Sequence, residues 1–190
     1  MGSKCSAELK AGRKNFMKKN IAIVLAAGQG KRMKSNIQKQ YLLIKNKPVL
    51  YYTLNAFEIS PLISEIILVT GKDEIEYCRE EIVKKYGFQK VHKIIAGGKE
   101  RYHSVYEGIQ AIDEADYVYI HDGARPFVDE EIIKRACEAV EKYQACVVGM
   151  PVKDTIKIAD KAGFASETPD RRRAVSYTHL RAHETLRHLV

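Results

Sequence analysis

Apolar residues come in short continuous runs that alternate with amphipathic stretches along most of the chain. The run IAIVLAA has no polar position, which is typical of a strand buried on both faces of a parallel sheet. Four later runs are similar, although some of them carry a few polar positions. The apolar runs predict five strands, at residues 21–27, 66–71, 91–98, 117–122 and 145–152.

The stretches between these runs have apolar residues at helical spacing. They predict four helices, at residues 48–58, 72–88, 100–113 and 129–143. Pro48 suits the first turn of a helix, and Gly87 suits the end of one. Because strand and helix alternate, we expect an α/β fold of three layers, a mainly parallel sheet with helices on both faces.

Four predicted strands are followed by turns rich in glycine, charged or hydroxyl residues. Ligands of open parallel sheets bind beyond the carboxyl ends of the strands. We therefore expect these turns to line one crevice. They read GQGKRM, AGGKER, HDGARP and PVKDT.

Composition narrows the class of protein. The 190 residues are 45% hydrophobic and 29% charged, as in an ordinary globular protein of one domain or at most two. No apolar run reaches the roughly 18–20 residues of a membrane span, so we expect no membrane partner. The four cysteines form no CxxC pair and no zinc-site spacing, which predicts a reduced, cytoplasmic chain.

The net charge of +8 lies at the two ends of the chain. Residues 1–20 have a net charge of +5, residues 171–190 have +4, and the middle has −1. A nucleic-acid-binding protein should carry its basic excess on a folded face, so we expect no nucleic-acid partner. We expect residues 1–16 to be a flexible leader.

The glycine-rich turn after the first strand is a candidate anion-binding loop. A dinucleotide fingerprint would need glycine where Met33 stands, and a Walker A loop would need glycine in place of Leu25. Small residues followed by Lys31 and Arg32 still allow backbone N–H groups and cations to approach a phosphate. The alternative is a tight strand-to-helix turn whose cations are solvated.

This loop, LAAGQGKRM, followed by Gln38-Lys39-Gln40-Tyr41, resembles the signature of nucleotidyltransferases that act on sugar or sugar-alcohol phosphates. Four later motifs follow in the family's order, AGGKER, HDGARP, PVKDT and ETPDR. Together they are similar to the 2-C-methyl-D-erythritol 4-phosphate cytidylyltransferases over about residues 17–172. The resemblance implies a Rossmann-like three-layer fold. It also implies transfer of CMP from CTP to 2-C-methyl-D-erythritol 4-phosphate, with release of pyrophosphate.

The resemblance also implies residue roles. Negative charge accumulates around the α-phosphorus during this transfer, and cations would stabilise it. The implied catalytic cations are Arg32, Lys39 and Arg171. The implied nucleotide-binding residues are Ala26, Ala27, Gly28, Gly30, Gly97, Gly98, Ser104 and Asp122. The implied acceptor-binding residues are Arg125 and Thr155.

The resemblance further implies Mg²⁺ bridging the triphosphate. No direct cluster of metal ligands is visible in the sequence, and Asp122 is the candidate ligand. The expected partners are CTP and a polyol phosphate. A second copy of the chain is also expected, because Arg171 resembles an arginine supplied across a homodimer interface.

The family pattern stops after Arg171. The expected Trp-containing segment is missing, because the chain has no Trp. We therefore expect the domain at 17–172 to be incomplete at its C-terminal end, and 173–190 to be a non-family tail, disordered or artefactual. Two other functions stay open. One is a ribitol 5-phosphate cytidylyltransferase. The sequence Ala26-Ala27-Gly28 and the pair Ser104-Val105 favour the methylerythritol phosphate enzymes over this alternative. The other is an inactive nucleotide-binding fragment.

Overall fold

The computed structural model describes residues 18–28 and 37–176. Two of the predicted site residues, Gly30 and Arg32, lie outside these ranges. The chain forms two compact units, residues 1–126 and 127–190, and each is described by itself. Within the described ranges, no helix combines the length and the apolar character needed to cross a membrane.

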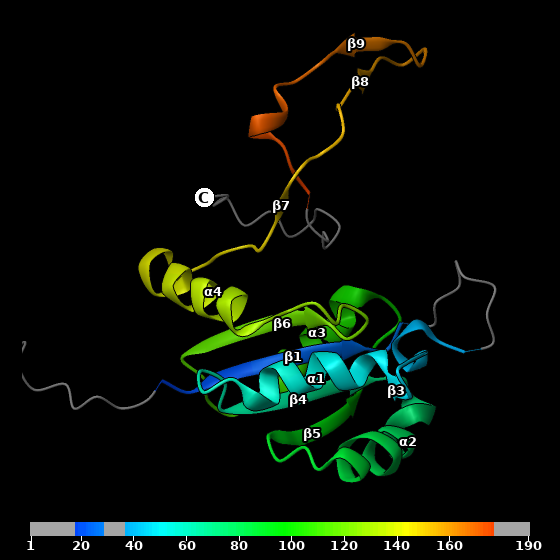
Figure 1. The fold of residues 1–190 in the computed structure, drawn as a ribbon, viewed down its shortest axis with the longest axis vertical. Helices are drawn as coiled ribbons and strands as arrows, with labels where there is room; N and C mark the ends of the chain where they lie inside the picture. Colours follow the sequence, from blue (N-terminus) through cyan, green and yellow to red (C-terminus); the bar gives the residue numbers. More distant parts are fainter. Residues whose placement is uncertain (1–17, 29–36, 177–190) are drawn as a thin grey trace, which may run out of the picture. The chain divides into compact units, whose positions relative to one another are not determined.

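The first unit is built on a four-stranded parallel sheet (Figure 1). Its order is β5-β4-β1-β6, so the first strand lies inside the sheet. All seven residues of β1 are buried, as the continuous apolar run predicted. The strands are β1 (Asn20–Ala26), β4 (Glu65–Thr70), β5 (Val91–Ala96) and β6 (Tyr117–Asp122). The first four predicted strands are thereby confirmed, with small differences at their ends.

Two helices, α1 (Val49–Ile59) and α3 (Arg101–Gln110), cover this sheet. Figure 1 shows α1 running along the front of β1 and β4. Both helices lie where the sequence predicted them. Pro48 stands just before α1, with a φ of −64° that suits a helix start.

The two helices pack on opposite faces of the sheet. From α1, the Phe57 ring lies 5.3 Å from the His121 ring, centroid to centroid. From α3, Gly108 lies so close to Ile23 that an added Cβ would come within 2.7 Å of its Cγ2. Val24 is paired with His121 and therefore shares its face, whereas Ile23 points the other way. The three layers predicted from the sequence are thereby confirmed.

The core lies between these layers. Leu50 and Leu54 from α1 are completely buried, as are Ile23 and Leu68 from the sheet. Burying a side chain of this size contributes about 1.5–3 kcal/mol relative to leaving it exposed, so this core is the main stabilising feature of the unit.

The helix predicted at 72–88 forms with three hydrogen-bonding patterns in succession. A 3-10 turn at Lys72–Glu74 leads into a short α segment at Ile75–Tyr77 and then a π-helical segment at Cys78–Lys84. Gly87 ends it with a φ of +71°, a conformation that glycine adopts without strain.

A short segment connects the region after β1 to α1. It consists of a 3-10 turn, η3 (Lys39–Tyr41), and a hairpin of β2 (Leu43–Ile44) and β3 (Lys47–Pro48). Lys45 and Asn46 have φ values of 49° and 61°, as in the two-residue turns that match strand twist.

In its described residues, 127–176, the second unit has one long helix, two short strand pairs and one 3-10 turn. Asp129 caps α4 (Glu130–Tyr143) by accepting a 2.8 Å hydrogen bond from the Ile132 N–H. The remaining elements are β7 (Met150–Pro151) paired with β10 (Val175–Ser176), β8 (Ile158–Ala159) paired with β9 (Ala165–Glu167), and η6 (Arg171–Arg173).

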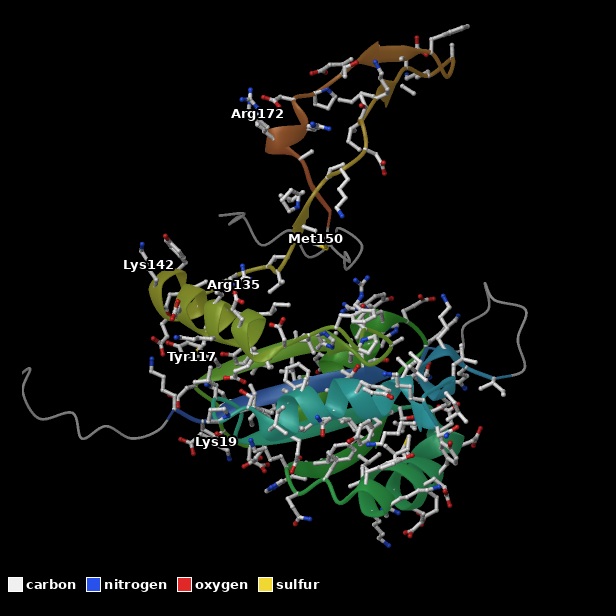
Figure 2. All side chains as sticks on the ribbon, in the orientation of Figure 1. Lys19, Tyr117, Arg135, Lys142, Met150 and Arg172 are labelled. Atoms are coloured by element: carbon white, nitrogen blue, oxygen red, sulfur yellow. The ribbon has the colours of Figure 1, made fainter. Side chains whose placement is uncertain are left out.

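The predicted strand at 145–152 is wrong over most of its length, because only Met150–Pro151 is extended and paired. Val147 and Val148 are 59% and 61% exposed, so this apolar run packs against little. Figure 2 shows the side chain of Met150 on this extended segment. An apolar run forms a stable strand only where neighbouring strands and a covering layer bury it.

Candidate functional site

The strand order marks one edge of the first unit as the place for a ligand. From β1 the chain continues to β4 on one side, and it later returns to β6 on the other side. In an open α/β sheet, ligands bind beyond the carboxyl ends of the strands where the order reverses in this way. Here that place lies beyond Ala26 of β1 and Asp122 of β6.

The carboxyl end of β1 is held by a neighbouring glutamine. The buried Gln40 donates from its Nε2 to the Ala26 carbonyl at 2.6 Å and to the Gly28 carbonyl at 3.3 Å. Ala27 is half-buried, and a Cβ on Gly28 would meet no described residue within 4 Å. The predicted residues Ala26, Ala27 and Gly28 therefore form the start of an open loop with a fixed base.

The end of β5 approaches the same place. The Gly97 N–H donates to the Thr70 carbonyl at 2.7 Å. A Cβ on Gly97 would lie 2.5 Å from the Ala27 Cβ and 2.6 Å from the Ser104 Oγ, so only glycine fits. The Gly98 N–H donates to the buried Ser104 Oγ at 3.1 Å. The structure thus brings together four predicted nucleotide-binding residues from three elements.

At the end of β6, Asp122 lies between two arginines. Arg101 donates from its Nε to the Asp122 Oδ1 at 2.9 Å, and its Nη2 is also 2.9 Å from that oxygen. Arg125 donates from its Nε to the Asp122 Oδ2 at 3.1 Å. Two separately predicted site residues, Asp122 and Arg125, are therefore in direct contact.

Arg101 was missed as a site residue by the sequence reasoning. It is the last residue of the quoted AGGKER motif, which was the available signal. Its buried Nη1 has no hydrogen-bond partner among the described residues. A guanidinium with spare donors beside the nucleotide-side residues can bind a phosphate or hydroxyl oxygen.

His121 precedes Asp122 but faces the other side of the strand, toward α1. Burial lowers the pKa of His121 to about 4, so its imidazole is neutral at pH 7. Thr53 donates from its Oγ1 to the Gly123 carbonyl at 3.0 Å and so fixes the turn after β6. These contacts hold the backbone of Asp122 rather than act on a ligand.

Lys39 is exposed, and it is followed on η3 by two residues whose side chains are held by hydrogen bonds. The first, Gln40, binds the end of β1. Beyond it, the Tyr41 hydroxyl lies 3.0 Å from the Thr70 Oγ1. Burial raises the pKa of Tyr41 far above its usual value, so the hydroxyl stays protonated and can donate. Lys39 therefore stands on a turn that is tied to the ends of β1 and β4.

Two predicted residues, Thr155 and Arg171, belong to the second unit, and both are exposed. Arg171 lines an open hollow of about 460 Å³ whose other lining residues are Pro151, Val152, Lys153 and Arg172. Arg172, labelled in Figure 2, pairs with Asp170 at 2.7 Å. The roles of Thr155 and Arg171 toward an acceptor stay predictions.

Metal ligands do not gather in the part of the chain that the structure describes: it contains no group of three or more His, Cys, Asp or Glu side chains suited to an ion. Both carboxylate oxygens of Asp122 are engaged by arginines. A Mg²⁺ ion that takes most of its ligands from phosphates needs only one or two protein carboxylates, and the role of Asp122 as one of them stays a prediction.

Comparison with known proteins adds to this geometry. The family model described as 2-C-methyl-D-erythritol 4-phosphate cytidylyltransferase matches residues 20–178. The protein of that name from Lachnoclostridium phytofermentans is 55% identical over 155 residues, and the one from Clostridium kluyveri is 51% identical over 152. These matches cover 82% and 80% of this chain and 66% of each relative.

A solved structure agrees with the sequence matches. The crystal structure of 4-diphosphocytidyl-2C-methyl-D-erythritol synthase from Anaerococcus prevotii superposes with a TM-score of 0.72 and is 32% identical in sequence. The match covers 84% of this chain and 66% of that one. The chain thus spans about 66% of the length of these relatives. The Rossmann-like nucleotidyltransferase fold predicted from the motifs is confirmed.

Proposed function

The chain belongs to the 2-C-methyl-D-erythritol 4-phosphate cytidylyltransferase family, and from this premise we propose that it transfers CMP from CTP to 2-C-methyl-D-erythritol 4-phosphate. In this reaction an oxygen of the acceptor's phosphate attacks the α-phosphorus of CTP. The bond from that phosphorus to the β-phosphate's bridging oxygen breaks, and pyrophosphate leaves. We place the reaction in the cytoplasm.

One observation supports the proposal that the chain binds CTP. Ala27, Gly97 and Ser104 approach so closely at the strand ends that a Cβ on the glycine would overlap both neighbours. Backbone N–H and C=O groups next to such small residues can reach the edge of a base, which selects cytosine by hydrogen bonds. The neighbouring Asp122 can accept a hydrogen bond from a ribose or acceptor hydroxyl.

The cations supply the rate enhancement. Preorganised charges aimed at the oxygens of the α-phosphate stabilise the transition state more than the ground state. We assign this role to Arg32 and Lys39. On the acceptor side, we assign Arg125 and Thr155 to the polyol and Arg171 to its phosphate, supplied by a second copy of the chain in a homodimer.

A divalent cation, Mg²⁺, belongs to this proposal, and Asp122 is the residue that would hold it together with the nucleotide's oxygens. When bound, the ion neutralises charge on the triphosphate and helps pyrophosphate to leave. Arg101 and Arg125 then keep the Asp122 carboxylate in place, since each is in direct contact with it.

The test is pyrophosphate release by the purified chain with CTP and Mg²⁺. We expect release with 2-C-methyl-D-erythritol 4-phosphate and little with ribitol 5-phosphate. Reactions without acceptor and reactions with ATP in place of CTP are the controls. Faster pyrophosphate release with ribitol 5-phosphate would identify that compound, rather than 2-C-methyl-D-erythritol 4-phosphate, as the acceptor. CTP binding measured by calorimetry, with no release from either acceptor, would identify the chain as an inactive nucleotide-binding fragment.

A further inference from the structure

One carboxylate, that of Glu74, binds both ends of the segment that carries Lys39. Its Oε1 accepts a hydrogen bond from the Gln38 Nε2, and its Oε2 accepts one from the Tyr41 hydroxyl at 3.0 Å. Gln38 and Tyr41 lie immediately before and two residues after Lys39. The same carboxylate therefore restrains the chain on both sides of the lysine.

Glu74 is itself held at the end of β4. Its Oε2 also accepts from the Thr70 Oγ1 at 3.2 Å and from the Gly71 N–H at 3.2 Å. A Cβ on Gly71 would lie 2.8 Å from that oxygen, so the glycine allows the carboxylate to come close to the backbone. Four donors thus converge on one carboxylate, and hydrogen bonds to an ionised acceptor are the strong ones.

The surroundings of these bonds are partly closed to water. Thr70 and Cys78 are completely buried, and the Tyr41 hydroxyl also lies 3.2 Å from the Cys78 Sγ. The Tyr41 ring packs edge-on against the Tyr77 ring, with 5.2 Å between centroids. Hydrogen bonds in such a setting are stronger than in water, so they can fix the segment.

We propose that Glu74 is a positioning residue for Lys39, holding residues 38–41 so that the exposed ammonium stands beside the carboxyl end of β1. This inference rests on the proposed function, because it assumes that Lys39 acts on the nucleotide's α-phosphate. Glu74 touches neither substrate nor reacting atoms. It acts through Gln38 and Tyr41, while Gln40 ties the same turn to Ala26.

Glu74→Gln tests the proposal, because it keeps the volume and removes the charge and one acceptor oxygen. Displacing a catalytic group by about 1 Å can lower turnover by about a hundredfold, and we expect a fall in kcat of about tenfold with KM for CTP changed less than about threefold. Glu76→Gln is the matched control, since Glu76 lies on the same helical stretch, is exposed and pairs with Arg79. We expect its kcat to be that of the wild type.

Two further variants should lower kcat by smaller or separable amounts, because each disturbs only part of the contacts of Glu74. Tyr41→Phe removes one of the four donors and leaves Glu74 charged, so kcat should fall by less than in Glu74→Gln. Gly71→Ala keeps every polar group but pushes the carboxylate away from the backbone, and kcat should fall while KM for CTP is retained. A rise in KM equal to the fall in kcat, together with a lower melting temperature, would indicate a structural role and overturn the proposal.

Amide hydrogen exchange gives a readout that does not depend on activity. The Tyr41 N–H donates to the Gln38 carbonyl at 2.9 Å and the Leu42 N–H to the Lys39 carbonyl at 3.3 Å, which protects both amides. We expect faster exchange at both in Glu74→Gln but not in Glu76→Gln. Unchanged exchange, or unchanged kcat, would overturn the proposal. If the wild type releases no pyrophosphate, the proposed function fails, whereas exchange still decides whether Glu74 holds the segment.

Discussion

The sheet of the first unit and the segment after α4 differ sharply in how they use apolar residues. Every residue of β1 is buried, and so are five of the six in β4. In β7, β8 and β9 every residue is exposed. Gly97 and Ser104, which the sequence predicts to bind the nucleotide, therefore lie on a unit with its own buried core. Thr155 and Arg171, which the sequence predicts to bind the acceptor, are exposed and lie on irregular chain and on the short turn η6.

This difference shows which unit holds its predicted site residues in fixed positions. A segment with few buried apolar contacts opens locally at low free-energy cost, whereas core strands open only with the whole unit. If Thr155 binds an acceptor as the sequence predicts, that binding includes the entropic cost of ordering this residue. In the first unit, the described strand ends that carry Ala27, Gly97 and Asp122 are already held by hydrogen bonds and ion pairs.

The largest expected effect is a cavity in the first unit's core. Leu54→Ala removes most of a fully buried side chain from α1, and we expect a loss of about 2–5 kcal/mol in the free energy of unfolding. Equilibrium urea denaturation measures it. A loss below about 1 kcal/mol would contradict the picture of a tightly packed first unit.

The next effect depends on pH. Because burial lowers the pKa of His121 to about 4, the unfolded chain binds more protons than the folded one between about pH 6.5 and 4. Stability should therefore fall as pH falls through this range, by about 3 kcal/mol from this group at pH 4. Urea denaturation at several pH values measures the fall.

The matched variants for this pH effect are His121→Gln and His92→Gln. The first removes the half-buried imidazole and should flatten the pH dependence, whereas the second changes an exposed histidine of β5 and should leave the pH dependence as in the wild type. Equal slopes in the two variants would show that His121 is not the group responsible.

Turnover gives the third comparison. Lys39→Ala should lower kcat by about a hundredfold or more, or about 2.7 kcal/mol of transition-state stabilisation, and Arg32→Ala should do the same. Lys45→Ala, an exposed lysine on the adjacent hairpin, is the control and should retain normal turnover. Near-normal kcat in both Lys39→Ala and Arg32→Ala would remove them from the mechanism.

The smallest effect lies in the second unit. Val148 is 61% exposed, so Val148→Ala should change the free energy of unfolding by no more than about 0.5 kcal/mol. The measurement is the same urea denaturation used for Leu54→Ala. A loss of 2 kcal/mol or more would show that this apolar run is buried in solution, and the contrast between the units would disappear.

Hydrophobic patterning predicted the first unit well and the second less well. The runs at 21–27 and 66–71 form buried strands, but the equally apolar run at 145–152 does not. The difference is physical, because a strand depends on neighbours that a local pattern does not contain. Helix α4 was predicted correctly, since its helical spacing is a local signal.

In the candidate site, too, the sequence predicted some residues and missed others. Glycine and motif spacing identified Gly97 and Ser104, which the structure brings together with Ala27. Arg101 and Glu74 were missed as site residues. Arg101 pairs with a residue 21 positions away and Glu74 with one 33 positions away. Nothing near either residue in the sequence indicates these partners. Only the fold supplies such pairings, because they depend on which strand ends become neighbours.

The central place of β1 also has a consequence for how the chain is made. Asn20 in β1 pairs with Tyr117 in β6, so the two strands that flank the site are joined by nearly the whole first unit. A ribosome delivers residues in order, at about 5–20 per second, and long-range parallel pairing forms slowly. Until β6 emerges, one edge of the apolar β1 is uncovered. That edge of the nascent chain must stay free of contacts with other chains for several seconds. The ends of β1 and β6 become neighbours only after β6 has paired with β1.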